Sequence, residues 1–235
     1  MRQIVLDTET TGLELSEGHR IIEIGCVELL HRRPSGRTWH RYLRPEREVE
    51  AGALAVHGIT NEFLAGQPRF AEIAGEFLEF IAGSELVIHN APFDVGFLDA
   101  ELARLKLPRF AQHAARITDS LLMAREQFPG KANSLDALCR RLEVDNSKRD
   151  LHGALIDADL LAQVYLNMTR GQDSLVIEAA QSARGPVAAA MTDLQQFELP
   201  VLEASADECA AHEAVLAQID KATGGKTVWR TAQPA

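Results

Sequence analysis

The chain has 235 residues and a formal net charge of −10, with 46% hydrophobic and 25% charged residues. This composition is that of an ordinary globular protein with one sizeable core and at most a small appendage. The acidic balance excludes a protein that holds nucleic acid unaided, because such proteins usually present a basic surface.

The sequence also predicts a cellular compartment. It contains no apolar run of about 18 residues that could span a membrane, and it shows no signal peptide. Cys26, Cys139 and Cys209 lie far apart and form no Cys-x-x-Cys pair, which favours reduced thiols over a zinc site or disulfides. We therefore expect a cytoplasmic protein without a membrane contact.

A β-meander is predicted at the start of the chain. Met1–Glu9, with the apolar run Ile4-Val5-Leu6, reads as a buried central strand, Ile21–Leu30 as a second strand and Trp39–Leu43 as a third. The segment His31–Arg37 contains Pro, Ser and Gly and is predicted to be the turn between the last two.

Helices and short strands are predicted to alternate after the meander. Glu50–Thr60 reads as a short helical turn followed by a loop that carries Val56, His57 and Gly58. The later elements follow from apolar spacing, caps and breakers: a helix over Phe70–Ile81, a strand over Glu85–Ile88, a helix from Pro92 to about Leu105, a strand over Ile117–Asp119, and helices over Leu121–Phe128, Asn133 or Ser134 to Leu142, and Gly153–Met168.

The character of the chain changes after Arg170-Gly171. Residues 181–204 mix small residues with Gly185 and Pro186 and are predicted to be a flexible linker. Within 205–235, Ala206–Ile219 is predicted to form one amphipathic helix. A lone helix cannot bury its own apolar face, so we expect this tail to fold against another protein, the alternative being a disordered terminus.

The first candidate functional residues stand at the end of the first strand. Because side chains alternate along a strand, Asp7 and Glu9 project from the same face, with Thr8 between them. Two neighbouring carboxylates repel each other, and burying them is costly unless a cation such as Mg²⁺ or Mn²⁺ sits between them. An isolated Asp-x-Glu is more often a solvated acidic turn, so the motif needs further partners.

Three further residues are candidate partners of Asp7 and Glu9 in one site. Asp94 begins a helix just after the fourth strand, where sites of α/β proteins tend to form. His152 precedes Asp157 by five residues, so His152 has to lie on the loop before the last long helix to face the same cleft. Taken singly, each has a plainer explanation as a helix-start charge, a surface imidazole or a solvated helix residue.

The order of these residues carries a family resemblance. Asp7-Thr8-Glu9-Thr10-Thr11-Gly12, His89 to Asp94, and His152 to Asp157 resemble the three exonuclease motifs of the DnaQ-like superfamily, with the histidine of its DEDDh branch. The resemblance covers residues 1–170 as one domain. It implies an α/β, ribonuclease-H-like fold with a mixed five-stranded sheet flanked by helices.

Within the superfamily the chain resembles the proofreading epsilon subunits of bacterial DNA polymerase III. The likeness rests on Val56 to Thr60, Asn133 to Cys139 and Asp145 to Arg149. It implies a 3′–5′ exonuclease that removes mismatched 3′-terminal nucleotides of DNA and releases 5′-mononucleotides. Residues 171–180 are similar to the sliding-clamp-binding peptide of that family, with Gln172, Leu175 and Ile177 as contact residues and Ile177 in place of the usual Phe.

The resemblance also implies roles for the site residues. Asp7, Glu9, Asp94 and Asp157 would hold two divalent ions, Mg²⁺ or Mn²⁺, and His152 would be the general base. The 3′-terminal nucleotides would contact Thr8, Val56, His57 and Phe93 besides Asp7, Glu9 and Asp157; Lys148 and Arg149 are further candidate phosphate contacts.

The resemblance extends to partners. The tail at 205–235 would bind the polymerase catalytic (alpha) subunit, and a small theta-like subunit is a further partner of the family. Two alternatives stay open: a stand-alone RNA exonuclease such as an oligoribonuclease or ribonuclease T-like enzyme, and a non-catalytic scaffold that bridges polymerase and clamp. The tail favours the polymerase subunit over the RNA enzyme, and the five intact site residues disfavour the scaffold.

Overall fold

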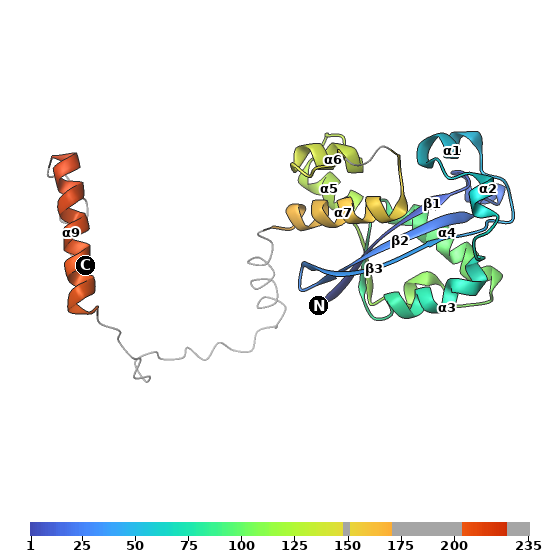
Figure 1. Ribbon diagram of the computed structural model, residues 1–235, viewed down its shortest axis with the longest axis horizontal. Helices are drawn as coiled ribbons and strands as arrows, with labels where there is room; N and C mark the ends of the chain where they lie inside the picture. Colours follow the sequence, from blue (N-terminus) through green and yellow to red (C-terminus); the bar gives the residue numbers. More distant parts are fainter. Residues whose placement is uncertain (148–150, 171–203, 225–235) are drawn as a thin grey trace, which may run out of the picture. The chain divides into compact units, whose positions relative to one another are not determined.

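The structure is a computed structural model that describes residues 1–147, 151–170 and 204–224 (Figure 1). The chain divides into two units, Met1–Gln181 and Ser182–Ala235. The first unit is built on one five-stranded sheet in the order β3-β2-β1-β4-β5. The strands are β1 (Arg2–Thr10), β2 (Ile21–Leu30), β3 (Arg33–Tyr42), β4 (Glu85–Ile88) and β5 (Arg116–Asp119).

The sheet is mixed, as predicted. β1 to β3 form the antiparallel meander, while β1, β4 and β5 run parallel to one another. The carboxyl ends of the three parallel strands therefore meet at one edge, where crevices of open α/β sheets form. β1 lies at the centre, and Ile4, Val5 and Leu6 are fully buried.

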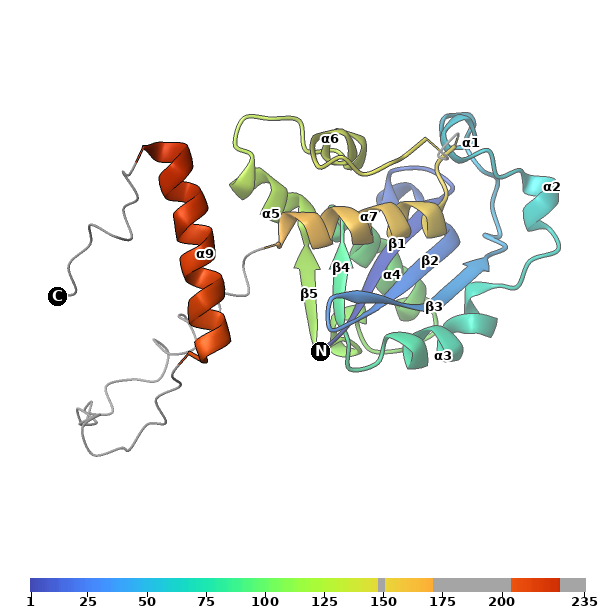
Figure 2. The same cartoon turned by 60° about the vertical axis from the view of Figure 1, so that its left-hand side comes forward.

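Alternation along β1 sends its side chains to two different helical layers. Val5 packs with Ala158 and Leu161 of α7 (Ala154–Met168). Ile4 and Leu6 belong to the cluster that contains α3 (Phe70–Ile81) and α4 (Ala91–Arg104). Figures 1 and 2 show these two layers on opposite faces of the sheet, with α5 (Ser120–Gln127) and α6 (Leu135–Arg141) on the side of α7.

The turn predicted over His31–Arg37 is wrong, because the structure turns within two residues. His31 and Arg32 both have positive φ, of 49° and 62°, and β3 starts directly afterwards at Arg33. Two left-handed residues match the twist of a tight hairpin. Pro34 and Gly36 then lie within β3, which is possible because β3 is an edge strand.

The segment before the second helical layer is also more regular than predicted. α1 (Ala51–His57) includes Val56 and His57, which the sequence placed on a loop, and it ends at Gly58 with φ of 70°. The sequence reading missed α2 (Asn61–Leu64) and the 3₁₀ turns η1 (Leu15–Glu17) and η2 (Phe110–Gln112). Such short elements leave too little periodicity to recognise.

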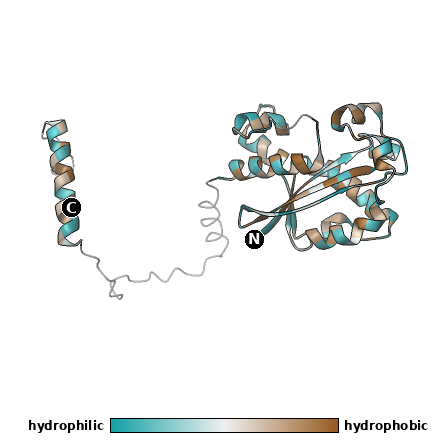
Figure 3. Cartoon of the chain, in the orientation of Figure 1, coloured by the Kyte–Doolittle hydropathy of each residue, from teal (hydrophilic) through white to brown (hydrophobic). Residues whose placement is uncertain are grey.

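The second unit contains the predicted helix, which extends slightly further, as α9 (Ala206–Thr223). Ser205 and Glu208 form a capping box at its start, and Gly224 closes its end. Among the described residues of this helix only Leu216 is buried, and polar and apolar residues alternate around it (Figure 3). The linker and the remaining tail lie outside the described residues.

The cysteines and the composition of the helices can be described for the part of the chain that the structure covers. Cys26 and Cys139 are buried, Cys209 is exposed, and all three are free thiols. No described helix combines the length and the apolar composition that crossing a membrane requires.

Candidate active site

The end of β1 supplies three site residues to two faces. Asp7 and Glu9 share the parity of Val5 and so lie on the face covered by α7, whereas Thr8 points to the face covered by α4. The Thr8 hydroxyl donates a hydrogen bond to Asp94 Oδ1 at 2.6 Å. The prediction that Asp7 and Glu9 project together agrees with this register.

α4 brings Asp94 to the edge of the sheet. Asn90 turns the chain with φ of 65° directly after β4, and Pro92 occupies the first turn of α4, as predicted. Asp94 is 3% exposed, and burial raises the pKa of its carboxyl to about 7 despite the opposing hydrogen bond from Thr8. A carboxylate in this position is destabilised without a neighbouring cation.

α7 is placed beside Asp7 by a glycine on the adjacent strand. Gly25 pairs with Asp7 across β1 and β2, and a Cβ on Gly25 would lie 2.3 Å from the backbone of Ala154 and Leu155. The first turn of α7 can therefore rest directly on the sheet. This contact carries Asp157, which is buried, to the strand end that bears Asp7.

His152 lies on the loop before α7, as predicted. Its Nδ1 is 3.2 Å from Asp157 Oδ2, and 44% of its side chain is exposed. The backbone N–H of His152 donates to the carbonyl of Val56 at 3.2 Å, which anchors this loop to the end of α1. The imidazole is thus both accessible to water and oriented by a carboxylate.

These elements converge on one polar cavity of about 270 Å³. Potential ligand atoms of Glu9, His152 and Asp157 lie within 4.8 Å of one another. The cavity is lined by the five predicted residues and by Thr8, His89, Phe93, Ser134, Leu135 and Asp136. The five carboxylates that line this space, the four predicted ones and Asp136, are hard oxygen donors, and the buried Asp94 among them fits a site for divalent cations.

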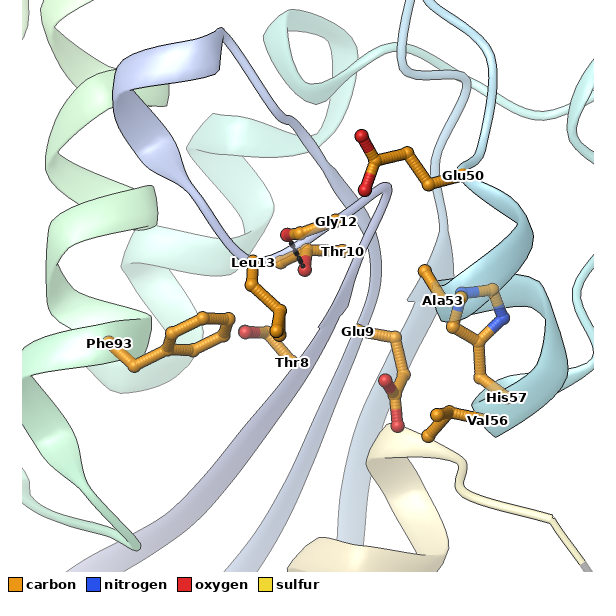
Figure 4. A pocket seen from close by; sticks show the side chains of 11 residues that line it. Thr8, Glu9, Thr10, Gly12, Leu13, Glu50, Ala53, Val56, His57 and Phe93 are labelled. Atoms are coloured by element: carbon orange, nitrogen blue, oxygen red, sulfur yellow. Dashed lines mark hydrogen bonds between the residues drawn. The ribbon is translucent and has the colours of Figure 1, made fainter.

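A second cavity of about 360 Å³ adjoins the first through Thr8, Glu9 and Phe93, which line both. Figure 4 shows Phe93 on one side of it and Val56 and His57 on the other, with Glu9 between them. The seven residues that the sequence proposed as contacts of the 3′-terminal nucleotides border one or both of these cavities: Asp7, Thr8, Glu9, Val56, His57, Phe93 and Asp157.

His57 is held in a defined orientation. Its Nδ1 accepts a hydrogen bond from the backbone N–H of Ile59, while its buried Nε2 has no hydrogen-bond partner among the described residues. Burial lowers the pKa of His57, which favours the neutral ring. A neutral ring that accepts at Nδ1 carries its proton on Nε2, which is buried inside the protein.

Several lining residues received no role from the sequence. His89 stands at the end of β4 with Nδ1 3.0 Å from Ser120 Oγ, and burial lowers its pKa. Asp136 belongs to α6, which packs on α7 beside the cavity. The available signals were that His89 is the first residue of the second motif and that Asp136 lies in the stretch Asn133 to Cys139, although neither residue was given a role.

Some predicted residues cannot be placed. Lys148 and Arg149, and the clamp-like residues Gln172, Leu175 and Ile177, lie outside the described residues. They remain predictions from the sequence.

Comparison with known sequences identifies relatives of almost the full chain. A family model described as Exonuclease matches residues 4–165. The DNA polymerase III subunit epsilon of Escherichia coli K12 is 51% identical over 238 residues, covering 97% of each chain. The subunit of the same name from Haemophilus influenzae is 48% identical and covers 97% of this chain and 94% of its own length.

Solved structures show the same fold. Exonuclease X in complex with 5′ overhanging duplex DNA matches with a TM-score of 0.54 and 25% identity, over 71% of this chain and 90% of that one. The nuclease domain of 3′hExo, a DEDDh family member bound to rAMP, matches with a TM-score of 0.63 and 20% identity. The match covers 73% of this chain and 92% of that one. The ribonuclease-H-like fold expected from the motifs is thereby confirmed. The chain accordingly belongs to the exonuclease family and, within it, to the epsilon subunits of DNA polymerase III, with the 3′–5′ proofreading exonuclease activity of that family.

Proposed function

We propose that the polar cavity is the catalytic centre at which the 3′-terminal phosphodiester of DNA is hydrolysed. The observation that carries this proposal is the convergence of five residues on one cavity: Asp7 and Glu9 from β1, Asp94 from α4, Asp157 from α7 and His152 from the loop before α7. The DEDDh class depends on divalent metal ions. In this chain Asp7, Glu9, Asp94 and Asp157 would hold two of them, Mg²⁺ or Mn²⁺, which activate water and neutralise the leaving oxygen.

His152 is the general base in this proposal. Its Nδ1 faces Asp157 Oδ2, so Nδ1–H donates to the carboxylate and Nε2 keeps the lone pair that accepts the proton of the attacking water. The exposure of the ring lets the proton pass to solvent after each cycle.

The adjoining cavity receives the terminal nucleotides. Phe93 offers an aromatic face to a base, and Val56 and His57 line the opposite wall. Val56 lines the same wall and anchors the His152 loop through its carbonyl. A correctly seated 3′ end would therefore support the position of the general base.

Partner binding supplies the affinity for DNA. With a net charge of −10 the chain lacks a basic footprint, which suits an editor brought to the primer by a polymerase. We infer that residues 205–235 bind the polymerase catalytic subunit, that residues 172–177 bind the sliding clamp, and that a theta-like subunit is a third partner. The relatives are bacterial polymerase subunits, so we place the chain at the replisome in the cytoplasm.

The test is a digestion assay with the full chain and Mn²⁺ on matched and mismatched primer ends, on single-stranded DNA and on short RNA. Asp157→Asn removes a charge from the cavity and should abolish digestion, whereas Asp159→Asn, on the exposed side of the same helix, should leave the rate within about twofold. An equal loss of digestion rate in both variants, or an unchanged rate in Asp157→Asn, would reject the polar cavity as the catalytic centre.

The same assay separates the two alternatives. A higher rate on short RNA than on DNA would support the stand-alone RNA exonuclease. Absence of digestion by the folded wild-type chain would support the non-catalytic scaffold. The coverage of 97% of the E. coli epsilon subunit, including its carboxyl-terminal part, favours the polymerase subunit over both.

A further inference from the structure

A second cluster of metal-ligand type lies outside the candidate active site. Potential ligand atoms of Glu17, His19 and Glu50 lie within 4.8 Å of one another, and none of these residues belongs to the cluster of Glu9, His152 and Asp157. Glu17 ends the 3₁₀ turn η1, His19 follows it before β2, and Glu50 immediately precedes α1. Three separate positions of the chain therefore meet here.

The central residue of the cluster is a buried imidazole with an unsatisfied nitrogen. The side chain of His19 is fully buried, and within the described structure its Nε2 makes no hydrogen bond of acceptable geometry. This nitrogen nevertheless lies 3.2 Å from Glu50 Oε1 and 3.5 Å from Glu17 Oε2. Leaving a buried polar atom unsatisfied is costly, so the arrangement indicates a missing binding partner between the three groups.

The spacing fits a metal ion at that point. Ligands about 2.0–2.1 Å from a tetrahedral ion lie roughly 3.3 Å from one another. The two distances from His19 Nε2, 3.2 and 3.5 Å, bracket this value. The two carboxylates are 64% and 51% exposed, which leaves an open side for water ligands.

The imidazole is held in position from behind. Its Nδ1 is 2.9 Å from Thr11 Oγ1, which also accepts a hydrogen bond from the backbone N–H of Arg20 at 3.0 Å. In the tautomer in which Nδ1 donates to Thr11 Oγ1, the lone pair of Nε2 faces the two carboxylates and is available to a cation. Gly12 leaves room for the ring, since a Cβ there would lie 2.3 Å from Cε1 of His19. Supporting contacts of this kind orient metal-binding histidines.

We propose that Glu17, His19 and Glu50 bind a transition-metal dication of the Zn²⁺ type, separately from the catalytic ions. One imidazole nitrogen and two carboxylates are a donor set that Zn²⁺ accepts, whereas Mg²⁺ prefers an all-oxygen octahedral shell. The ion would join the segment after β1 to the start of α1. Glu50 and Gly12 also line the cavity shown in Figure 4, so the ion would stiffen this part of the cavity wall.

The experiment uses the full chain with Asp7→Asn and Asp157→Asn, which empties the candidate active site of two carboxylates. The protein is loaded with Zn²⁺ in excess Mg²⁺, passed over a desalting column and assayed for zinc content and thermal unfolding. We expect about one zinc ion per chain and a rise of several degrees in Tm. Co²⁺ in the same site should show the visible absorption of four-coordinate cobalt.

Two further variants on this background make the result specific. Glu17→Gln with Glu50→Gln changes only exposed side chains, so it should fold, and it should lower the zinc affinity at least tenfold and remove the rise in Tm. Glu48 is also exposed and lies two residues from Glu50, so Glu48→Gln should retain the zinc affinity and the rise in Tm. Equal zinc retention in the double variant and in Glu48→Gln, or no retained zinc in the parent, overturns the proposal. Neither outcome bears on the nuclease assay, which is run with Mn²⁺ on an intact active site.

Discussion

At the scale of single residues, the two faces of β1 divide the chemistry between them. Asp7 and Glu9 lie on the α7 side with Asp157 and His152, while Thr8 reaches through to the α4 side and donates to Asp94. Asp94 and Asp157 are each only 3% exposed, and burial raises the pKa of the Asp94 carboxyl, so Asp94 depends strongly on a cation. The raised pKa of Asp94 reflects the free-energy cost of ionising a carboxyl that is buried away from water.

Metal-free protein should lose stability as the pH rises because of Asp94. The folded pKa of about 7 lies above the ordinary value of 3.8, so the stabilising contribution of the protonated carboxyl is complete below about pH 4 and is lost as the pH rises through 7. The loss is on the order of a few kcal/mol at most, since one pKa unit corresponds to about 1.4 kcal/mol.

The measurement is chemical denaturation of the metal-free full chain between pH 4 and pH 8, compared with Asp94→Asn. In the variant the amide oxygen of the introduced asparagine can still accept the hydrogen bond from Thr8, but the side chain no longer titrates. Its free energy of unfolding should therefore change less between pH 4 and pH 8. Mn²⁺ added at pH 8 should restore the wild type and not the variant. Parallel pH curves for the two proteins would contradict the assignment.

The general-base role of His152 gives a second prediction at the residue scale. His152→Ala should lower kcat on single-stranded DNA by about 10²–10⁴, the usual contribution of a positioned base. It should leave the melting temperature nearly unchanged, because the side chain is 44% exposed. His31→Asn, at the exposed hairpin turn, is the matched control. A similar kcat in both variants would exclude His152 as the base.

At the scale of elements, the site depends on how closely α7 approaches β2. Gly25 permits this contact, because a Cβ at this position would lie only 2.3 Å from backbone atoms of Ala154 and Leu155, which is a steric clash. The start of α7 then carries both Asp157 and the preceding His152 loop. A shift of this one helix moves two site residues at once.

Gly25→Ala should therefore reduce both stability and activity. Overpacking of a tight interface costs about 1–3 kcal/mol of folding stability. Because α7 carries Asp157 and the His152 loop, its displacement should also lower kcat. Gly75→Ala is the control, because it lies on the exposed side of α3 with no atom within 4 Å of an added Cβ. There we expect a gain of up to about 1 kcal/mol. Denaturation curves and digestion rates are measured for both; unchanged kcat in a folded Gly25→Ala protein would contradict the role of the contact.

At the scale of the whole molecule, the described residues form a catalytic unit and a separate helix, α9. The first unit, Met1–Gln181, holds every described residue of the candidate active site. The second contains α9, whose described residues bury only Leu216. Chemistry and partner binding are thus assigned to different parts of the chain.

Truncation after Gln181 should separate the two activities. The shortened chain should digest single-stranded DNA within about twofold of the full chain, because the candidate site is complete within the first unit. Addition of the polymerase should accelerate removal of mismatched primer ends only for the full chain, where tethering can add about 10²–10⁴ in apparent affinity. Equal acceleration of both chains would place the polymerase contact within the first unit.

The sequence alone determined the fold class, the strand order of the meander and the five residues of the candidate site. It could do so because an apolar strand ending in Asp-x-Glu, a helix start at Asp94 and the His152–Asp157 spacing are local patterns, and their order carries the family resemblance. The tertiary structure alone decided that His57 belongs to a helix and is buried, and that β3 begins at Arg33.

Only the tertiary structure could reveal the cluster of Glu17, His19 and Glu50. These residues are spread over more than thirty positions without a recognisable ligand spacing, and they meet because β1 and α1 bring their connecting segments together. Local patterns report on neighbours in the sequence, whereas packing brings together groups that no local pattern connects. The same reason explains why burial of Asp94 and the tight approach of α7 to Gly25 became apparent only in the folded chain.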